Sequence, residues 1–402
     1  MKINRIGLML LAVVLVGFFA CKKDTTTEMN TGNLVVIQLE KPAEMSHLLI
    51  ESLTATLKET NTGMELQWKG TDLSFTENLP LGVYTIQVEG KASYVVQGVK
   101  EEVAIAGLLQ GAKVVAGQER LSLKLYVVNN QLDFVIEELY FTGSLTPENQ
   151  QYLGDRYIKL YNNSERVLYA DGLVIATTAF QTVDKRDYKP NIMEEAVAVD
   201  AVMVIPGNGK TYPVQPGGAI VIAESAINHK EFNRLAINLS QADFEIVAPD
   251  DDETIDNPNV PNLEALFDRI VINNRGFQSF ILARIPVSKA VYLSDFTYAY
   301  SYKFVEGDFS FDMEDLAYKI PNEWVIDAVN LSVASEFKWL VTAVSLDRGW
   351  TYCGKYSGDT SRYGKSVRRK VIGTSAAGHR RLKDTNNSSV DFDAEVQPSL
   401  KN

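Results

Sequence analysis

The chain contains little cysteine and little histidine. Its 402 residues include two cysteines, Cys21 and Cys353, and three histidines, His47, His229 and His379. None of the histidines lies in a recognisable catalytic or metal-binding motif, and Ser-His-Asp or Cys-His catalysis needs an oriented imidazole. Gly-x-Ser-x-Gly, His-Glu-x-x-His and phosphate-loop motifs do not occur. The sequence therefore does not favour an enzyme. An exported hydrolase acting on glycan or peptide is the alternative, because the carboxylate pairs of glycosidases are defined by geometry and not by spacing.

Basic residues are also fewer than acidic ones. The chain has 39 Lys and Arg against 51 Asp and Glu, a net charge of −12. An acidic surface excludes nucleic acid and anionic lipid as general partners. It suits a protein that stays soluble beside a membrane, and it is compatible with cation binding.

The N-terminus carries the most informative pattern. Lys2 and Arg5 precede an unbroken apolar run from Ile6 to Ala20, and Cys21 follows. A basic head and an apolar stretch are typical of a secretory signal. The run is shorter than the roughly 20 residues that a membrane-spanning helix needs. Residues 1–20 are therefore predicted to be a signal peptide.

This segment resembles a bacterial lipoprotein signal, in which cleavage precedes a cysteine that is then acylated. Ala20 fits the small residue before the cysteine, and Phe18 stands where an aliphatic residue is usual. The resemblance implies attachment to the outer membrane through lipid on Cys21, with residues 21–32 as a flexible polar tether. Lys22-Lys23-Asp24 resembles the surface-export signal of Bacteroidota lipoproteins, so cell-surface and periplasm-facing positions both stay open. The competing interpretation is an ordinary cleaved signal with an unmodified cysteine.

Cys353 has no disulfide partner if Cys21 is acylated. It lies in the aromatic segment Trp350-Thr351-Tyr352-Cys353. A buried, inert thiol is the preferred interpretation, and a nucleophile is the alternative. Stability must then come from burial of a hydrophobic core, which a chain of this length can supply.

Residues 33–128 read as a small β-sandwich. Leu34–Leu39 is rich in strand-forming residues, and Pro80-Leu81-Gly82 predicts a turn into a strand over Val83–Val88 whose side chains alternate. The segment Leu79–Val88 resembles the corresponding strand of prealbumin-like and carboxypeptidase-regulatory-like domains. That resemblance implies a seven-stranded, Ig-like sandwich that serves as a spacer.

Residues 132–402 read as a larger β domain with insertions. Several segments in order resemble the lamin tail domain, which is an Ig-like β-sandwich with mostly noncatalytic roles. The segments are Phe134–Phe141, Tyr157–Asn162, Pro216–Ala223, Glu323–Val329, Ser366–Lys370 and Asp384–Phe392. The predicted fold is therefore mostly β, an Ig-like sandwich followed by a lamin-tail-like sandwich. The whole resembles an uncharacterised family of Bacteroidota lipoproteins.

Two polar segments could be binding loops. Asp250, Asp251, Asp252, Glu253 and Asp256 form an acidic cluster, and Ca²⁺ prefers six to eight hard oxygen ligands. The spacing is not that of an EF-hand, and a solvated acidic loop explains the cluster equally simply. Calcium is the sole cofactor to consider. The second segment, Asp384–Ser389, is interpreted as a structural turn closed by its own side chains.

Aromatic residues recur at every second position in one segment. Phe296, Tyr298, Tyr300, Tyr302 and Phe304 are expected to share one face of a strand. They either pack in the core or form an exposed ladder for a glycan or protein partner. The sequence thus predicts a noncatalytic binding or assembly lipoprotein of a Gram-negative outer membrane, beside an outer-membrane protein such as a transport receptor.

Overall fold

The computed structural model describes residues 33–42, 48–96, 99–117, 120–128, 133–246, 255–307, 309–375 and 377–401. Cys21, the predicted tether and the acidic residues Asp250–Glu253 lie outside these ranges, as does His47. The predicted mostly β class is confirmed, because strands dominate the described chain and its helices are short. Among the described residues, no helix has the length and apolar composition needed to cross a membrane.

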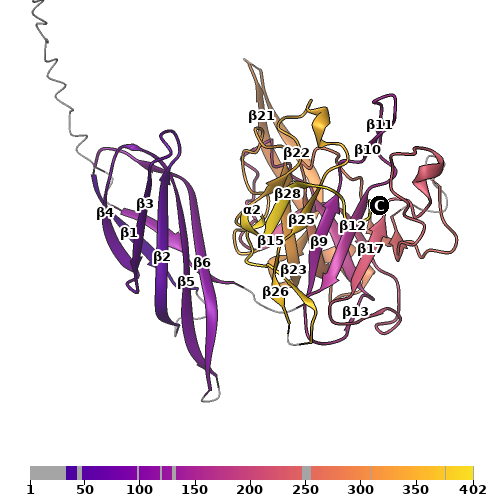
Figure 1. The fold of residues 1–402 in the computed structure, drawn as a ribbon. Helices are drawn as coiled ribbons and strands as arrows, with labels where there is room; N and C mark the ends of the chain where they lie inside the picture. The colour runs from indigo at the N-terminus through magenta and orange to yellow at the C-terminus, as the bar shows by residue number, and fades with distance from the viewer. Residues whose placement is uncertain are drawn as a thin grey trace, which may run out of the picture.

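The N-terminal sandwich consists of a three-stranded sheet in the order β4-β1-β7 and a five-stranded sheet in the order β3-β2-β5-β6-β8 (Figure 1). Its strands are β1 (Asn33–Glu40), β2 (Leu49–Glu59), β3 (Glu65–Gly70), β4 (Ser74–Leu79), β5 (Gly82–Val96), β6 (Val99–Val114), β7 (Arg120–Lys124) and β8 (Tyr126–Val127). The strand predicted at Val83–Val88 lies in β5, where Tyr84, Ile86 and Val88 are buried. They pack against Ile37 of the facing sheet, so alternate side chains build the core.

The C-terminal sandwich also consists of two sheets that share a core. A six-stranded sheet has the order β18-β17-β12-β9-β25-β28, and an eight-stranded sheet has the order β21-β22-β15-β14-β20-β23-β24 with β19 paired to β15. Phe134 and Leu160 of the first sheet pack in one cluster with Ile175, Leu282 and Leu331 of the second. Removal of this apolar surface from water is the main stabilising term for such a sandwich.

The strands of these two sheets include most of the segments that resemble the lamin tail domain, whereas residues 384–391 form a turn and helix α2 (Ser388–Asp391). The strands are β9 (Phe134–Tyr140), β12 (Tyr157–Asn162), β14 (Leu173–Thr178), β15 (Ala196–Val204), β17 (Ala219–Ala223), β18 (Phe244–Glu245), β19 (Glu264–Phe267), β20 (Ser279–Arg284), β21 (Thr297–Glu306), β22 (Phe309–Pro321), β23 (Val325–Ser332), β24 (Thr351–Tyr352), β25 (Ser366–Arg369) and β28 (Phe392–Val396). Four of the segments named above supply β9, β12, β17 and β25, which are neighbours in one sheet.

Short two-stranded pairs, helices and 3-10 turns connect the strands of the C-terminal sandwich. The two-stranded pairs are β10 (Ser144–Leu145) with β11 (Gln151–Tyr152), β13 (Leu168–Tyr169) with β16 (Pro213–Val214), and β26 (Val371–Thr374) with β27 (Arg380–Leu382). The helices are α1 (Lys289–Asp295) and α2 (Ser388–Asp391), and the 3-10 turns are η2 (His229–Glu231), η3 (Asn322–Trp324) and η4 (Thr360–Arg362).

A buried arginine connects the two sandwiches. Arg348 donates a hydrogen bond from Nη2 to Oε1 of Glu89 on β5, over 2.8 Å. Its backbone N–H donates to the carbonyl of Asn386, and its Nη1 donates to the carbonyl of Thr385 over 2.6 Å. Because the Arg348 side chain is 3% exposed, this contact is shielded from solvent on the arginine side.

Candidate functional site

A long hairpin of β21 and β22 carries the aromatic residues that the sequence predicts as a ladder. The antiparallel register places Tyr298 opposite Ala317, Tyr302 opposite Met313 and Phe304 opposite Phe311. Directly opposed residues lie on the same face, so this face combines aromatic and apolar side chains of both strands, with Asp315 opposite Tyr300 as a polar member. In Figure 1 the hairpin projects beyond the body of the C-terminal sandwich.

The base of this surface is packed into an aromatic cluster, defined here as Phe180, Tyr188, Tyr298, Tyr300, Tyr302 and Trp339. Tyr298 is 4% exposed and donates a hydrogen bond to the carbonyl of Pro190 over 2.7 Å. Its ring stacks on Tyr300 at a centroid distance of 5.3 Å, and Tyr300 stacks on Tyr302 at 6.2 Å. Trp339, another member of the cluster, is held in place by a hydrogen bond that its Nε1 donates to the carbonyl of Gln181 over 2.8 Å. The cluster holds the base of the hairpin rigidly.

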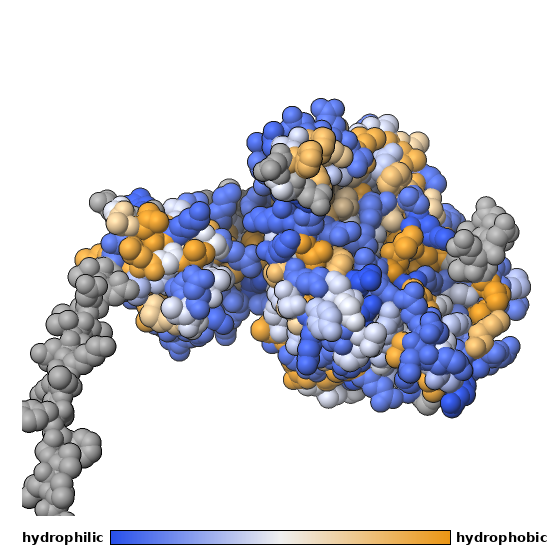
Figure 2. Space-filling view, turned by 90° about the horizontal axis from the view of Figure 1, so that it is seen from above, coloured by the Kyte–Doolittle hydropathy of each residue, from blue (hydrophilic) through white to orange (hydrophobic). Residues whose placement is uncertain are grey.

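The far end of the hairpin is exposed. We define the hairpin tip as Phe309, Phe311 and Met313, whose side chains are 70%, 55% and 40% exposed. Figure 2, seen from the side toward which the hairpin projects, shows hydrophobic surface interrupting a mostly hydrophilic face. The Arg186 guanidinium lies 4.8 Å from the centroid of the Phe304 ring, between the tip and the cluster. Grouped exposed apolar side chains are typical of an interaction surface.

The expectation that five rings share one face is wrong for Phe296. That residue precedes β21 and ends helix α1, whose first turn is capped by the Ser288 side chain. Its backbone, with φ −111° and ψ 25°, is not extended, so the alternation of the strand does not reach it. Phe296 packs instead against Trp324 at 4.7 Å and Tyr292 at 5.7 Å. The other four rings divide between a packed base and the approach to the tip.

A cavity of about 570 Å³ is lined by His229 and Tyr152, the pair that bears on the hydrolase hypothesis. The Ser225 carbonyl can only accept, so Nε2 of His229 carries the proton of the 2.8 Å bond between them. Nδ1 then accepts from the Tyr152 hydroxyl over 2.8 Å. Burial lowers the pKa of His229 and raises the pKa of Tyr152 to about 12. Ser225 thus orients the imidazole, and the raised pKa of Tyr152 disfavours ionisation of the one hydroxyl that His229 contacts here.

The other residues considered for catalysis are placed as follows. Cys353 is fully buried, as predicted, and burial raises the pKa of its thiol, which makes the thiolate scarce. His379 is half-buried and lies against Gly217, whose φ of +74° favours glycine. These two residues and His229 come from different parts of the fold.

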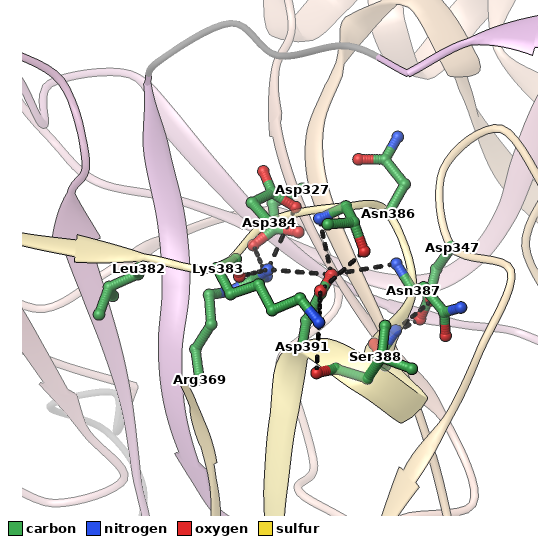
Figure 3. Close-up of polar contacts among 12 residues, drawn as sticks. Asp327, Asp347, Arg369, Leu382, Lys383, Asp384, Asn386, Asn387, Ser388 and Asp391 are labelled. Carbon is green, nitrogen blue, oxygen red and sulfur yellow. Dashed lines mark hydrogen bonds and ion pairs between the residues drawn. The ribbon is translucent and has the colours of Figure 1, made fainter. Parts of the chain in front are cut away.

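The predicted turn at Asp384–Ser389 is part of a buried polar network (Figure 3). Asn387 caps helix α2 through its side chain, which accepts from the backbone N–H of Ser389. Asp391 accepts hydrogen bonds from the backbone N–H of Thr385 and from its hydroxyl, both over 2.8 Å. The structural interpretation of this segment is therefore confirmed.

Asp256 is the one member of the predicted calcium cluster within the described chain. Its Oδ1 accepts a hydrogen bond from the Asn262 side chain over 2.7 Å. In the described ranges, no group of three or more His, Cys, Asp or Glu side chains is arranged to hold a metal ion. Asp250, Asp251, Asp252 and Glu253 lie outside these ranges, so the calcium hypothesis for them stays a prediction.

The comparisons with known proteins bear on the fold and on the C-terminal region. A family model described as "Protein of unknown function (DUF4876)" matches residues 215–399. The C-terminal region is thus similar to the DUF4876 family. A solved DUF4876 family protein from Bacteroides thetaiotaomicron VPI-5482 is 22% identical, covering 91% of this chain and 96% of that chain with a TM-score of 0.57. This likeness shows the fold over nearly the whole length.

A second solved structure, a candidate adhesin from Bacteroides ovatus ATCC 8483, is 10% identical over 77% of this chain and 88% of that chain, with a TM-score of 0.20. No curated protein matches. The predicted similarity to an uncharacterised family represented in Bacteroides is supported, whereas the prealbumin-like and lamin-tail-like domain types stay predictions.

Proposed function

We propose that the protein is a lipid-anchored, noncatalytic binding or assembly protein of a Gram-negative outer membrane, and that it contacts a protein partner through the hairpin tip. The observation that carries the proposal is the contrast along one hairpin. Its base is fixed by the aromatic cluster, while Phe309 and Phe311 are held in solvent beyond the sandwich. Apolar side chains displayed on a rigid support are suited to burial against a partner.

The chemistry of the tip favours a protein over a glycan. Phe309, Phe311 and Met313 offer no hydrogen-bond donor, and a methionine is a weak acceptor at most. Sugars present many hydroxyl groups, which lose hydrogen bonds with water when they are buried against such a surface. A protein surface can supply complementary apolar side chains instead. An outer-membrane protein, such as a transport receptor, is the partner that fits the predicted location.

The anchor in this proposal is the predicted lipid on Cys21, with residues 21–32 as the tether and residues 33–128 as the spacer. The contact of Arg348 with Glu89 supports a spacer that holds the C-terminal sandwich in a defined orientation. The test is membrane fractionation of the full chain and of its Cys21→Ser variant. Transfer of the variant to the soluble fraction is expected, and an unchanged membrane-bound fraction would remove the lipid anchor from the proposal.

Partner binding is tested by affinity capture from envelope membranes. Wild type, a Phe309→Ala/Phe311→Ala variant and an Ile372→Ala control are compared. Ile372 is also an exposed apolar side chain, at 62%, but it lies on β26. The proposal expects an outer-membrane protein that wild type and the control retain and the double variant loses. Equal capture by all three would contradict a role for the tip.

A further inference from the structure

The hairpin has one open backbone edge. Strand β15 pairs with β22 only through Tyr318–Pro321 of β22. From Val202 onward, β15 pairs with β19 instead. Over Phe309–Leu316, the strand neighbour of β22 within the described chain is therefore β21 alone. The backbone N–H and C=O groups on the opposite edge of this stretch can pair with another strand, except at Leu316, whose N–H already donates to Oδ1 of Asp315 over 2.8 Å.

The edge of β21 is different because a loop already covers part of it. Lys189, in the loop between β14 and β15, exchanges two backbone hydrogen bonds of 2.9 Å with Ser301. The same loop supplies Phe180 and Tyr188 to the aromatic cluster. Among the described residues, the edge of β22 is thus the longer open one on this hairpin.

The side chains along this edge have a two-faced pattern. Phe309, Phe311 and Met313 point to the aromatic face, and the alternate residues Asp312 and Glu314 point to the other face. Both carboxylates are exposed. Lys303 lies 3.2 Å from Asp312, but it stands on β21, on the side away from the open edge. A strand added beside β22 would meet Phe309, Phe311 and Met313 on one face, followed by Asp315. On the other face it would meet Asp312 and Glu314, flanked by Ser310 and Leu316.

The same pattern disfavours pairing with a second copy of the chain. Antiparallel pairing of two β22 strands centred on Met313 places Asp312 of each copy opposite Glu314 of the other. Like charges at directly opposed positions destabilise a strand pair. Acidic residues on an edge strand are a known means of preventing self-association. This register between two copies is therefore disfavoured, while the edge stays open to a different partner.

We propose that the open edge of β22 recognises its protein partner by strand addition, and that the added segment alternates apolar with basic side chains. Main-chain hydrogen bonds then supply affinity, and the two faces supply specificity. The apolar side chains extend the surface formed by the hairpin tip, and the basic ones pair with Asp312 and Glu314. This inference rests on the proposed function and names the chemistry of its partner.

The test uses the exported chain and two synthetic peptides of about ten residues, the length of a long strand. One alternates Val with Lys and the other alternates Val with Glu. Fluorescence anisotropy is expected to show binding of the Lys peptide that weakens at high salt, and no binding of the Glu peptide. A Phe311→Ala variant should weaken the Lys peptide by about tenfold. Amide hydrogen exchange should slow within residues 309–317 when the Lys peptide binds.

A charge reversal provides the sharper comparison. Glu314→Lys should reduce affinity for the Lys peptide by about tenfold and create affinity for the Glu peptide. Glu148→Lys is the matched control, because Glu148 is exposed on the loop between β10 and β11. Equal peptide affinities for both variants, or peptide binding without protection of residues 309–317, would overturn strand addition.

Two further outcomes are distinguished. A dimer that sedimentation detects in wild type and that Phe311→Ala abolishes would overturn the heterologous partner in favour of a second copy. If neither peptide binds while capture of the membrane partner still depends on Phe309 and Phe311, strand addition is wrong and the proposed function stands. Loss of that dependence would contradict the proposed function itself.

Discussion

Arg369 and Asp327 form a buried ion pair between the two sheets of the C-terminal sandwich. Arg369 lies on β25 of the six-stranded sheet and Asp327 on β23 of the eight-stranded sheet, with 2.5 Å between Nη2 and Oδ2. Nη1 also lies 3.1 Å from Oδ1 of Asp384 and 3.8 Å from Oδ2 of Asp391. Nε donates to the carbonyl of Ile136 over 3.0 Å. One guanidinium thus forms ion pairs with three carboxylates and links the two sheets of the C-terminal sandwich.

Replacement of Arg369 should therefore destabilise the C-terminal sandwich severely. Arg369→Ala leaves Asp327 and Asp391 buried without their cation, and breaking a buried pair in this way costs about 3–5 kcal/mol. Denaturant unfolding followed by intrinsic fluorescence measures the loss. Arg381→Ala is the control, because Arg381 is exposed and should change stability by less than about 0.5 kcal/mol. A similar small effect for Arg369→Ala would show that the pair contributes little.

Asp347 should make stability depend on pH. Burial raises its pKa from 3.8 to about 6, although hydrogen bonds from Ser388 and Asn330 oppose the increase. Between these two values the folded state binds more protons than the unfolded state, so the free energy of unfolding falls as pH rises through this window. Asp347→Asn removes the titrating group, and its unfolding free energy should fall less steeply over the same range.

The residual slope of that variant contains the contributions of other buried carboxyl groups whose pKa burial raises, among them Asp327, Asp391 and Glu224. The measurement is urea unfolding at several pH values between about 4 and 7. Parallel pH curves for wild type and Asp347→Asn would contradict the assignment of this slope to Asp347.

Local patterns in the sequence predicted strands well and their ends less well. The alternation in Val83–Val88 indicates one buried face, and Tyr84, Ile86 and Val88 occupy it. The same alternation rule wrongly placed Phe296 in a strand, because a helix capped by Ser288 precedes β21. That cap is visible in the sequence, since a serine before a short helical segment is a typical start signal.

The division of the aromatic run into base and tip depended on tertiary contacts. Gly307, with φ +58°, lies between two alternating runs and is a sequence signal for the hairpin. Tyr298 packs against Phe180, Tyr188 and Trp339, which come from segments far apart in the chain. Local periodicity cannot predict such contacts. The sequence did not reveal the Arg369 network for the same reason, because its carboxylate partners come from two separate segments, Asp327 in one and Asp384 and Asp391 in the other.

Cys353 should resist thiol reagents in the folded protein. In a Cys21→Ser background it is the one remaining thiol, and it is fully buried. Its modification requires an opening that costs about 5 kcal/mol, so labelling should be about 4,000-fold slower than in denaturant. The time course of labelling by an aromatic disulfide reagent measures this ratio. Rapid labelling of the native protein would instead identify an accessible thiol and restore the nucleophile hypothesis.

Tyr298→Ala should reduce stability, whereas Phe311→Ala should reduce partner binding and leave stability nearly unchanged, although both residues lie on one face of the hairpin. Removal of the buried Tyr298 ring leaves a cavity against Phe180 and frees the Pro190 carbonyl, at a cost of about 3–5 kcal/mol and a melting transition lower by about 10 °C. Phe311 is exposed, so its replacement should change stability by less than about 0.5 kcal/mol. Calorimetry measures the stability of both variants, and capture of the membrane partner measures their binding. A large stability loss in Phe311→Ala would show that Phe311 is a packed core residue, and the proposed binding surface at the hairpin tip would then be wrong.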